Sequence, residues 1–351
     1  MDLDLAQRLA GLSRATYAAD PVAALPVAGS VRAEGFVTPC FRGLAVSDER
    51  AVYLVFRGTR PGPQESADLR AVLGGWVANL DYRLHDLGGY RVHRGFAHEV
   101  EAVERSLREL ALDHGAEGKP LYLTGHSAGG ALATIAARRL HERGVPVRGA
   151  VVFSSPRVGD AAFAETYPVP LVRIERRHDV VPHLPLPPRV AWTLGRMGVD
   201  RLLERLDLSG QVPGAAELRL AETEYLHSGE LFYDDGEDAL YRVPPGDFGR
   251  RFGRLMWREV RADLGRGEPP DEAAYVAAAC PRWATPVPAR LLDATRFAAM
   301  ARAVMRETKA GGRDFLTDHH IDGAVAFIMR LLGLVPDVGR APLSGGPEGP
   351  M

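Results

Sequence analysis

The fold of this chain is decided by the stretch Leu121-Tyr-Leu-Thr-Gly-His-Ser-Ala-Gly-Gly130. A short apolar strand pattern runs into Gly-x-Ser-x-Gly, and an alanine-rich helix pattern over residues 129–143 follows. This order places Ser127 on a sharp turn at the end of the strand, where flanking glycines leave room for the backbone. An ordinary glycine-rich turn also yields these letters, but the strand before it and the helix after it favour a nucleophilic serine.

The surrounding sequence alternates between strand and helix patterns. The predicted strands are a hairpin over 42–56 and single strands at 121–124, 147–153 and 171–174. The predicted helices cover 3–19, 97–114 and 129–143. Repeated strand–helix–strand order is typical of a mainly parallel sheet, so the fold class is α/β.

The pattern changes after the last of these strands. We interpret residues 1–189 as the α/β core and 190–315 as a mostly helical insertion or cap, with a short strand near 225–233. Residues 316–339 resume apolar helical periodicity and are predicted to form the final core helix. Residues 340–351 are rich in Gly and Pro and are predicted to be a disordered tail.

Composition limits the class of protein. The chain has 351 residues, 46% hydrophobic and 25% charged, with a net charge of -2, so nothing indicates a nucleic-acid partner. Its 2 cysteines give no disulfide framework or metal-binding spacing. The start of the sequence lacks a signal-peptide pattern, and no apolar run is long enough to span a membrane. We therefore expect a cytoplasmic protein, with a leaderless export route left open.

Several sequence blocks, in order, resemble the class 3 lipases, the fungal-type lipase family of α/β-hydrolases. They are Val55-Phe-Arg-Gly-Thr59, Gly75-Trp-Val-Ala-Asn-Leu-Asp81, Val92-His-Arg-Gly-Phe96, Phe153-Ser-Ser-Pro-Arg-Val-Gly-Asp160 and His178-Asp-Val-Val-Pro-His-Leu-Pro185. The resemblance covers about 40–190 and resumes near 225–235 and 315–330. It implies an α/β-hydrolase with a Ser–Asp–His triad.

The resemblance assigns the triad to Ser127, Asp179 and His319. Asp179 follows the strand predicted at 171–174, at the carboxyl end where α/β sites form. His319 lies in Asp-His-His-Ile, where the adjacent His320 competes for the role if the register shifts by one. His227 matches a separate family block and is a further alternative base.

The resemblance also implies an oxyanion hole made by the backbone N–H groups of Thr59 and Ala128, the residue after the nucleophile. Leucine often stands in the family where this chain has Ala128, a change that a backbone donor tolerates. The remaining histidines show no metal-site pattern, so we expect no metal and no cofactor.

These residues predict a serine hydrolase that cleaves carboxylic esters of lipid-like substrates or small esters through an acyl-enzyme. The alternatives are a phospholipase A or an acyltransferase on the same triad, and a non-catalytic lipase-like scaffold protein. Residues 60–75 occupy the position of the family's lid. Residues 248–261 form a basic amphipathic pattern, which indicates either a helix docked on the protein or peripheral contact with a membrane.

Overall fold

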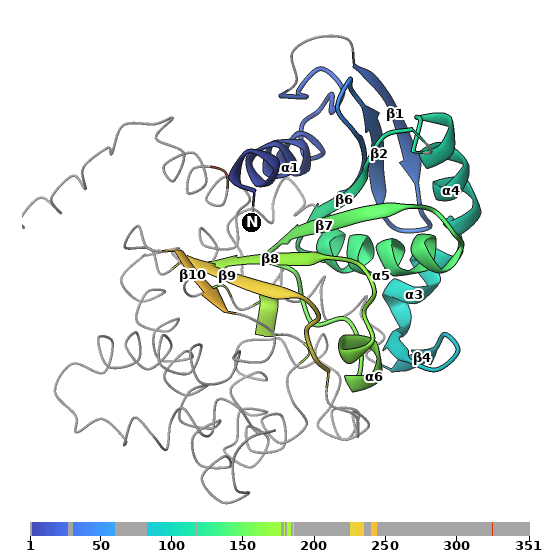
Figure 1. Ribbon diagram of the computed structural model, residues 1–351, viewed down its shortest axis with the longest axis vertical. Helices are drawn as coiled ribbons and strands as arrows, with labels where there is room; N and C mark the ends of the chain where they lie inside the picture. Colours follow the sequence, from blue (N-terminus) through green and yellow to red (C-terminus); the bar gives the residue numbers. More distant parts are fainter. Residues whose placement is uncertain are drawn as a thin grey trace, which may run out of the picture.

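The computed structural model describes residues 2–26, 31–59, 83–116, 118–176, 179, 181–183, 185, 225–234, 240–243 and 325. Its centre is an 8-stranded sheet, shown in Figure 1. The strands, in spatial order, are β1 (Arg32–Val37), β2 (Arg42–Ser47), β3 (Val52–Phe56), β6 (Leu121–His126), β7 (Val147–Phe153), β8 (Leu171–Arg176), β9 (Glu230–Asp234) and β10 (Leu240–Val243). A separate hairpin joins β4 (Leu84–Asp86) to β5 (Arg91–His93).

The middle of the sheet is parallel and its edges are antiparallel. Each neighbouring pair from β3 through β6, β7 and β8 to β9 runs parallel. The pairs β1–β2, β2–β3 and β9–β10 run antiparallel. This arrangement confirms the predicted α/β fold with a mainly parallel central sheet.

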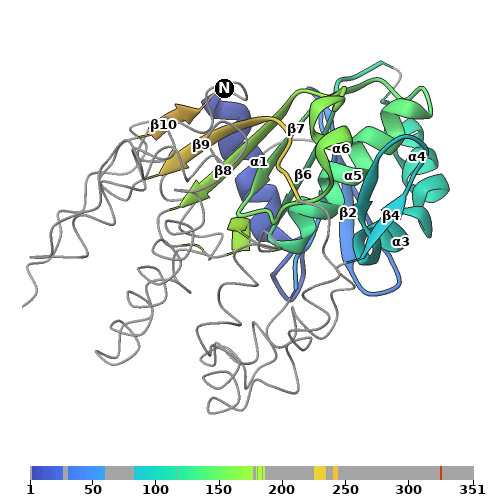
Figure 2. The same cartoon turned by 90° about the horizontal axis from the view of Figure 1, so that it is seen from below.

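Helices cover both faces of the sheet (Figures 1 and 2). Their bounds are α1 (Leu3–Ala15), α3 (Arg94–Glu101), α4 (Glu104–Asp113), α5 (Ala128–Glu142), α6 (Ala161–Glu165) and the short 3₁₀ helix η1 (Val181–His183). Side chains of α1 belong to one buried cluster, and side chains of α3, α4 and α5 belong to the other. The sheet is therefore the middle layer of three.

Strand β3 shows how the sequence produces this layering. Val52, Leu54 and Phe56 belong to the cluster under α3–α5, whereas Tyr53 and Val55 belong to the cluster under α1. Successive side chains of a strand point to opposite faces, so an uninterrupted apolar run fits a strand that is buried on both sides.

The prediction of one continuous helix over 97–114 was wrong. The structure has two helices, α3 and α4, separated at Ala102 and Val103. Val103 departs from helical geometry, with φ -123° and ψ 2°. Its side chain is buried in the same cluster as those of α3 and α4, so the apolar spacing continues through the break and does not reveal it.

Two sheet edges differ from the expectation. Strands β1 and β10 were not predicted, and the strand expected near 225–233 begins at Glu230. Strand β9 pairs with β8 in the core sheet. Most of 190–315 lies outside the described residues, as do the predicted tail and the segments 60–75 and 248–261, so those interpretations stay predictions.

Within 316–339 the structure describes Val325, which is helical and buried. It belongs to the same cluster as Ile174 of β8 and Phe232 of β9, the face that α1 also covers. Across the described part of the chain, no helix has both the length and the apolar character that crossing a bilayer requires.

Candidate active site

The residues assigned to the site follow the carboxyl ends of neighbouring parallel strands. The register pairs Phe56 with Gly125, His126 with Phe153, and Phe153 with Ile174. These ends therefore share one edge of the sheet, the edge at which open α/β folds build their sites. Thr59 follows β3, Ser127 follows β6 and Asp179 follows β8.

Ser127 occupies a strained turn between β6 and α5. Its backbone has φ 59° and ψ -131°, a conformation that costs a non-glycine residue about 1–3 kcal/mol. Its N–H donates to the Phe153 carbonyl at 2.9 Å, which fixes the turn on β7. A Cβ on Gly125 would lie 2.2 Å from the Gly129 carbonyl oxygen, so the glycine is required there. Among the described non-glycine residues, only Ser127 and Ser154 have a positive φ.

The residues next to Ser127 bring backbone donors to it. Ala128 is the first residue of α5, whose N-terminal N–H groups carry partial positive charge, and the Ser127 side chain does not cap this helix. A Cβ on Gly58 would lie 2.5 Å from the His126 carbonyl oxygen and 3.0 Å from the Ser127 Cβ. Glycine thus lets the end of β3, with the adjacent Thr59, closely approach the turn between β6 and α5 that carries Ser127. This turn is called the elbow below.

Tyr17 holds this approach from the far side of the sheet. The Gly58 N–H donates to the Tyr17 hydroxyl at 3.1 Å, and the hydroxyl lies 3.0 Å from His126 Nδ1. Burial raises the pKa of Tyr17, so the phenol keeps its proton and can direct it to Nδ1. The sequence pattern showed Tyr17 only as an apolar position of the helix predicted over 3–19, which is a correction because α1 ends at Ala15. The role of Tyr17 depends on a contact across 109 positions.

Asp179 is buried, with 1% of its surface exposed. Its Oδ1 accepts the Val181 N–H at 2.9 Å, and its own N–H donates to the Arg176 carbonyl at 3.0 Å. The carboxylate is therefore held in a tight turn between β8 and η1. The segment from Asp179 to Pro185 is called the acid loop below. Arg157 Nη1 donates to the Pro185 carbonyl at 2.9 Å and links this loop to the segment after β7.

A buried ion pair lies on β8, the strand that leads into the acid loop. Arg173 and Glu175, on β8, are 3% and 4% exposed and contact each other directly. Arg173 Nε donates to the Ser228 carbonyl at 3.0 Å. Burial lowers the pKa of Arg173, and Glu175 opposes that shift. Arg173 and Glu175 alternate with Val172 and Ile174 in β8, and two opposite charges two positions apart in a central strand indicate a buried ion pair. This pair was not predicted from the sequence.

His227, the alternative base, contacts the acid loop. Its Nε2 lies 2.7 Å from the Pro182 carbonyl oxygen and 3.8 Å from Glu175 Oε1. A carbonyl only accepts hydrogen bonds, so Nε2 carries a proton and is engaged with η1. His319 and His320 lie outside the described residues.

Three of the sequence blocks that carry the family resemblance contact one another: residues 92–96, residues 153–160 and the segment near 225–235. The His93 N–H donates to the Val158 carbonyl at 2.8 Å, and the Leu226 N–H donates to the Gly159 carbonyl at 2.7 Å. The ring of His93 lies 6.1 Å from that of Tyr225. His93 is 1% exposed, and burial lowers its pKa to about 3, so the imidazole is neutral.

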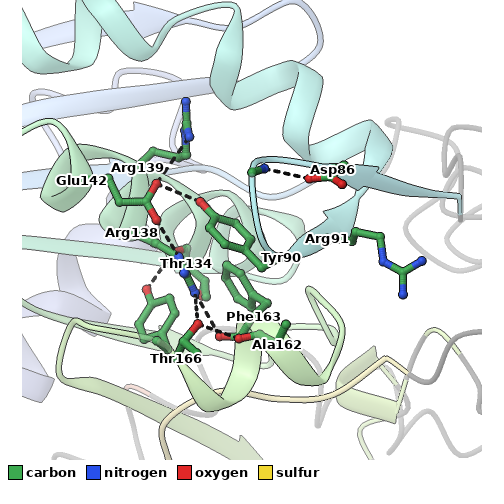
Figure 3. A network of polar contacts seen from close by, with 12 residues as sticks. Asp86, Tyr90, Arg91, Thr134, Arg138, Arg139, Glu142, Ala162, Phe163 and Thr166 are labelled. Carbon is green, nitrogen blue, oxygen red and sulfur yellow. Dashed lines mark hydrogen bonds and ion pairs between the residues drawn. The ribbon is translucent and has the colours of Figure 1, made fainter.

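A polar network fixes helix α5 behind the elbow, as Figure 3 shows. The guanidinium carbon of Arg138 lies 3.5 Å from the centroid of the Tyr90 ring. Arg138 also donates to Glu142 Oε1 at 2.8 Å, to the Phe163 carbonyl at 3.2 Å and to Thr166 Oγ1 at 3.1 Å. The Tyr90 hydroxyl donates to Glu142 at 2.9 Å. The network joins α5 to Tyr90, in the turn before β5, and to α6.

Comparisons with known proteins agree with this geometry. The family model described as lipase (class 3) matches residues 53–188. A lipase of Rhizomucor miehei is 33% identical over 150 residues, which are 39% of this chain and 38% of that protein. A secreted mono- and diacylglycerol lipase of Fusarium solani is 34% identical over 119 residues, 31% of this chain and 35% of that protein.

A phospholipase A1-II of Oryza sativa subsp. indica is 34% identical over 134 residues, 36% of this chain and 32% of that protein. The match therefore spans less than two fifths of the length of each of these relatives. A solved Rhizomucor miehei lipase, a deletion mutant in complex with its propeptide, has the same fold, with a TM-score of 0.51 and 21% identity over 70% of this chain and 71% of that one. Residues 53–188 of this chain are thus similar to the class 3 lipases, and the chain has the fold of a solved fungal lipase, the α/β-hydrolase fold.

Proposed function

We propose that this chain hydrolyses carboxylic esters of lipid-like substrates through an acyl-enzyme on Ser127. One observation carries the proposal: Ser127 adopts φ 59° and ψ -131° at the first turn of α5, next to the end of β3. Ser127 is buried, with 2% of its surface exposed, and its sharp strand-to-helix turn is the backbone geometry that a nucleophilic serine requires in this type of acyl transfer.

Each proposed residue has a role in the reaction. Ser127 Oγ attacks the ester carbonyl while His319 takes its proton, and Asp179 orients the imidazole. The N–H groups of Thr59 and Ala128 bind the oxyanion, each contributing about 3 kcal/mol to stabilisation of the transition state. His319 then protonates the leaving alcohol, and water activated by the same histidine releases the acid.

Labelling with a fluorophosphonate tests the nucleophile. Wild type should be labelled and should hydrolyse p-nitrophenyl esters, whereas Ser127→Ala should lose labelling and about 10⁶-fold in kcat. Ser155→Ala is a matched control, since Ser155 is a buried serine at the end of the next strand whose hydroxyl donates to the Pro156 carbonyl. Labelling that survives in Ser127→Ala would refute the proposal, and unlabelled wild type would favour the scaffold alternative.

Single substitutions distinguish the base. We expect His319→Ala to match Ser127→Ala in lost turnover, while His320→Ala and His227→Ala keep much more. The Pro182 contact of His227 Nε2 supports this order, because a base needs that nitrogen's lone pair directed at the serine. A larger loss in His320→Ala would move the assignment by one residue.

The names of the relatives indicate which lipids to test. They include a mono- and diacylglycerol lipase and a phospholipase A1, so both glycerides and phospholipids are candidate substrates. Purified protein should be compared on triacylglycerol, monoacylglycerol and phosphatidylcholine, with an added alcohol acceptor to detect acyl transfer. We place glyceride hydrolysis first. Faster fatty-acid release from phosphatidylcholine would favour the phospholipase alternative.

The cytoplasmic location and peripheral membrane contact remain predictions from the sequence. The Fusarium solani relative is named as secreted, a property of that protein. Fractionation of cells that produce the chain would locate it, and sedimentation with anionic vesicles would test membrane contact.

A further inference from the structure

Three metal-ligating side chains converge on elements that carry none of the proposed catalytic residues. His85 lies on β4, and His98 and Glu101 lie in the last turn of α3. The hairpin of β4 and β5 lies beside α3 in both views (Figures 1 and 2). Each side chain offers one ligand atom, and all 3 atoms lie within 4.8 Å of one another.

The spacing suits a tetrahedral ion. His85 Nε2 is 3.3 Å from Glu101 Oε2. Ligand atoms at the usual zinc distances of about 2.0–2.2 Å lie about 3.3 Å apart in a tetrahedron, so this pair already has the required separation. The rings of His85 and His98 meet edge to face with centroids 5.1 Å apart, and the ligand atom of His98 lies within 4.8 Å of those of His85 and Glu101. His98 and Glu101, three positions apart on a helix, share one face.

A simple ion pair explains this cluster less completely. A protonated His85 paired with Glu101 needs one histidine, yet a second imidazole lies against the first. The side chains remain accessible to an ion, since His85 is half-buried and the other two are exposed. Two imidazoles and one carboxylate form a donor set that suits zinc, whereas Mg²⁺ and Ca²⁺ prefer oxygen ligands throughout.

We propose that His85, His98 and Glu101 bind a zinc ion, with water in the fourth position. The ion joins β4 to the last turn of α3, in addition to the hydrogen bond from the Arg94 N–H to the Arg83 carbonyl at 2.8 Å. It therefore stabilises the hairpin that leads into His93. No sequence motif indicates this site, because its ligands come from separate elements and follow no recognised spacing.

Zinc binding by the full chain tests the proposal directly. After chelator treatment, titration calorimetry with ZnCl₂ should show a site that His85→Ala, His98→Ala and Glu101→Gln each weaken by at least 10–100-fold, since even loss of an outer-shell partner has that effect. At about 100 times the dissociation constant, zinc should raise the Tm of wild type by roughly 5 °C. Cobalt should give the intense visible absorption of a four-coordinate site.

The control variant is His141→Ala, which removes an exposed histidine on α5 outside the cluster and should bind zinc like wild type. All four positions are at least partly exposed, so the variants should fold, and circular dichroism of the metal-free proteins checks this. Absence of zinc binding overturns the proposal. So does zinc binding that His85→Ala, His98→Ala and Glu101→Gln all retain, because the ion would then lie elsewhere.

Discussion

The elbow side of the proposed site is built from close approaches of the backbone, whereas the acid side is built from buried polar side chains. On the elbow side, Gly58 and Gly125 allow contacts that no Cβ permits, and Tyr17 adds the one polar side chain described above. Close backbone approach needs glycine at fixed positions in the chain. A short motif therefore identifies the elbow side.

The acid side depends on partners that are distant in sequence. Arg173 and Glu175 pair on β8, and Arg173 also holds the Ser228 carbonyl, 55 positions away. His227 contacts the Pro182 carbonyl across 45 positions. These contacts tie β8 and η1, which flank Asp179, to residues 227 and 228 through buried charge and hydrogen bonds, so the acid side should respond more strongly to changes of charge and pH than the elbow side does.

Among changes on the acid side, the largest effect should come from Asp179→Asn. The amide oxygen still accepts the Val181 N–H, so the fold is kept, but the imidazole loses its orienting charge and kcat should fall about 10⁴-fold. Ester turnover and a melting curve measure the two effects. Asp160→Asn is the matched control, because Asp160 is another buried aspartate, which caps α6, and should keep wild-type turnover. A loss below tenfold in Asp179→Asn would remove Asp179 from the triad.

A single change in the buried ion pair should destabilise the fold. Arg173→Met removes the cation that contacts the buried Glu175, and breaking a buried pair in this way costs about 3–5 kcal/mol, measured by urea unfolding. The double variant Arg173→Met/Glu175→Met should recover most of that loss, because a packed apolar pair replaces the ions. Arg105→Met, which breaks the exposed pair with Glu109, should have little effect. Equal stability of Arg173→Met and Arg105→Met would contradict the dependence of the acid side on charge.

Burial of His93 should make the fold sensitive to acid. Its folded pKa is about 3, below the unfolded value of about 6.5, so the unfolded chain binds a proton that the folded chain does not. Stability is therefore complete above pH 6.5 and is lost as pH falls toward 3. At pH 4.5 the loss should be about 2–3 kcal/mol. His93→Asn keeps an acceptor for the Phe96 N–H and should reduce the change in the free energy of unfolding between pH 6.5 and 4.5. If that change is the same in the variant and in wild type, other groups cause it.

The difference between the two sides also explains which parts could be predicted. Strand, turn and helix around Ser127 follow from adjacent residues, and β7 has the predicted bounds. The break at Val103 was missed because burial continues through it. The antiparallel edges β1 and β10 were missed because their pairing partners, not their own patterns, define them.

For the site, resemblance to a family supplied Asp179, but no sequence pattern supplied the buried charges on β8, the strand that precedes it. Arg173 and Glu175 look like surface charges until β9 is placed beside β8 and buries them. Tyr17 looks like a core residue of the helix predicted over 3–19 until its hydroxyl meets Gly58 and His126. Such contacts arise only from the folded arrangement.

The smallest effect should come from Tyr17→Phe, the one change that tests a polar contact on the elbow side. The Gly58 N–H loses its acceptor, which should lower the free energy of unfolding by about 1–2 kcal/mol. Because Thr59 follows Gly58, we also expect kcat to fall by up to about tenfold with KM nearly unchanged. Tyr53→Phe is the control, since that hydroxyl contacts Asp48, away from the elbow. If Tyr17→Phe loses stability but keeps kcat, Tyr17 supports the fold only, and the elbow side depends on its glycines alone.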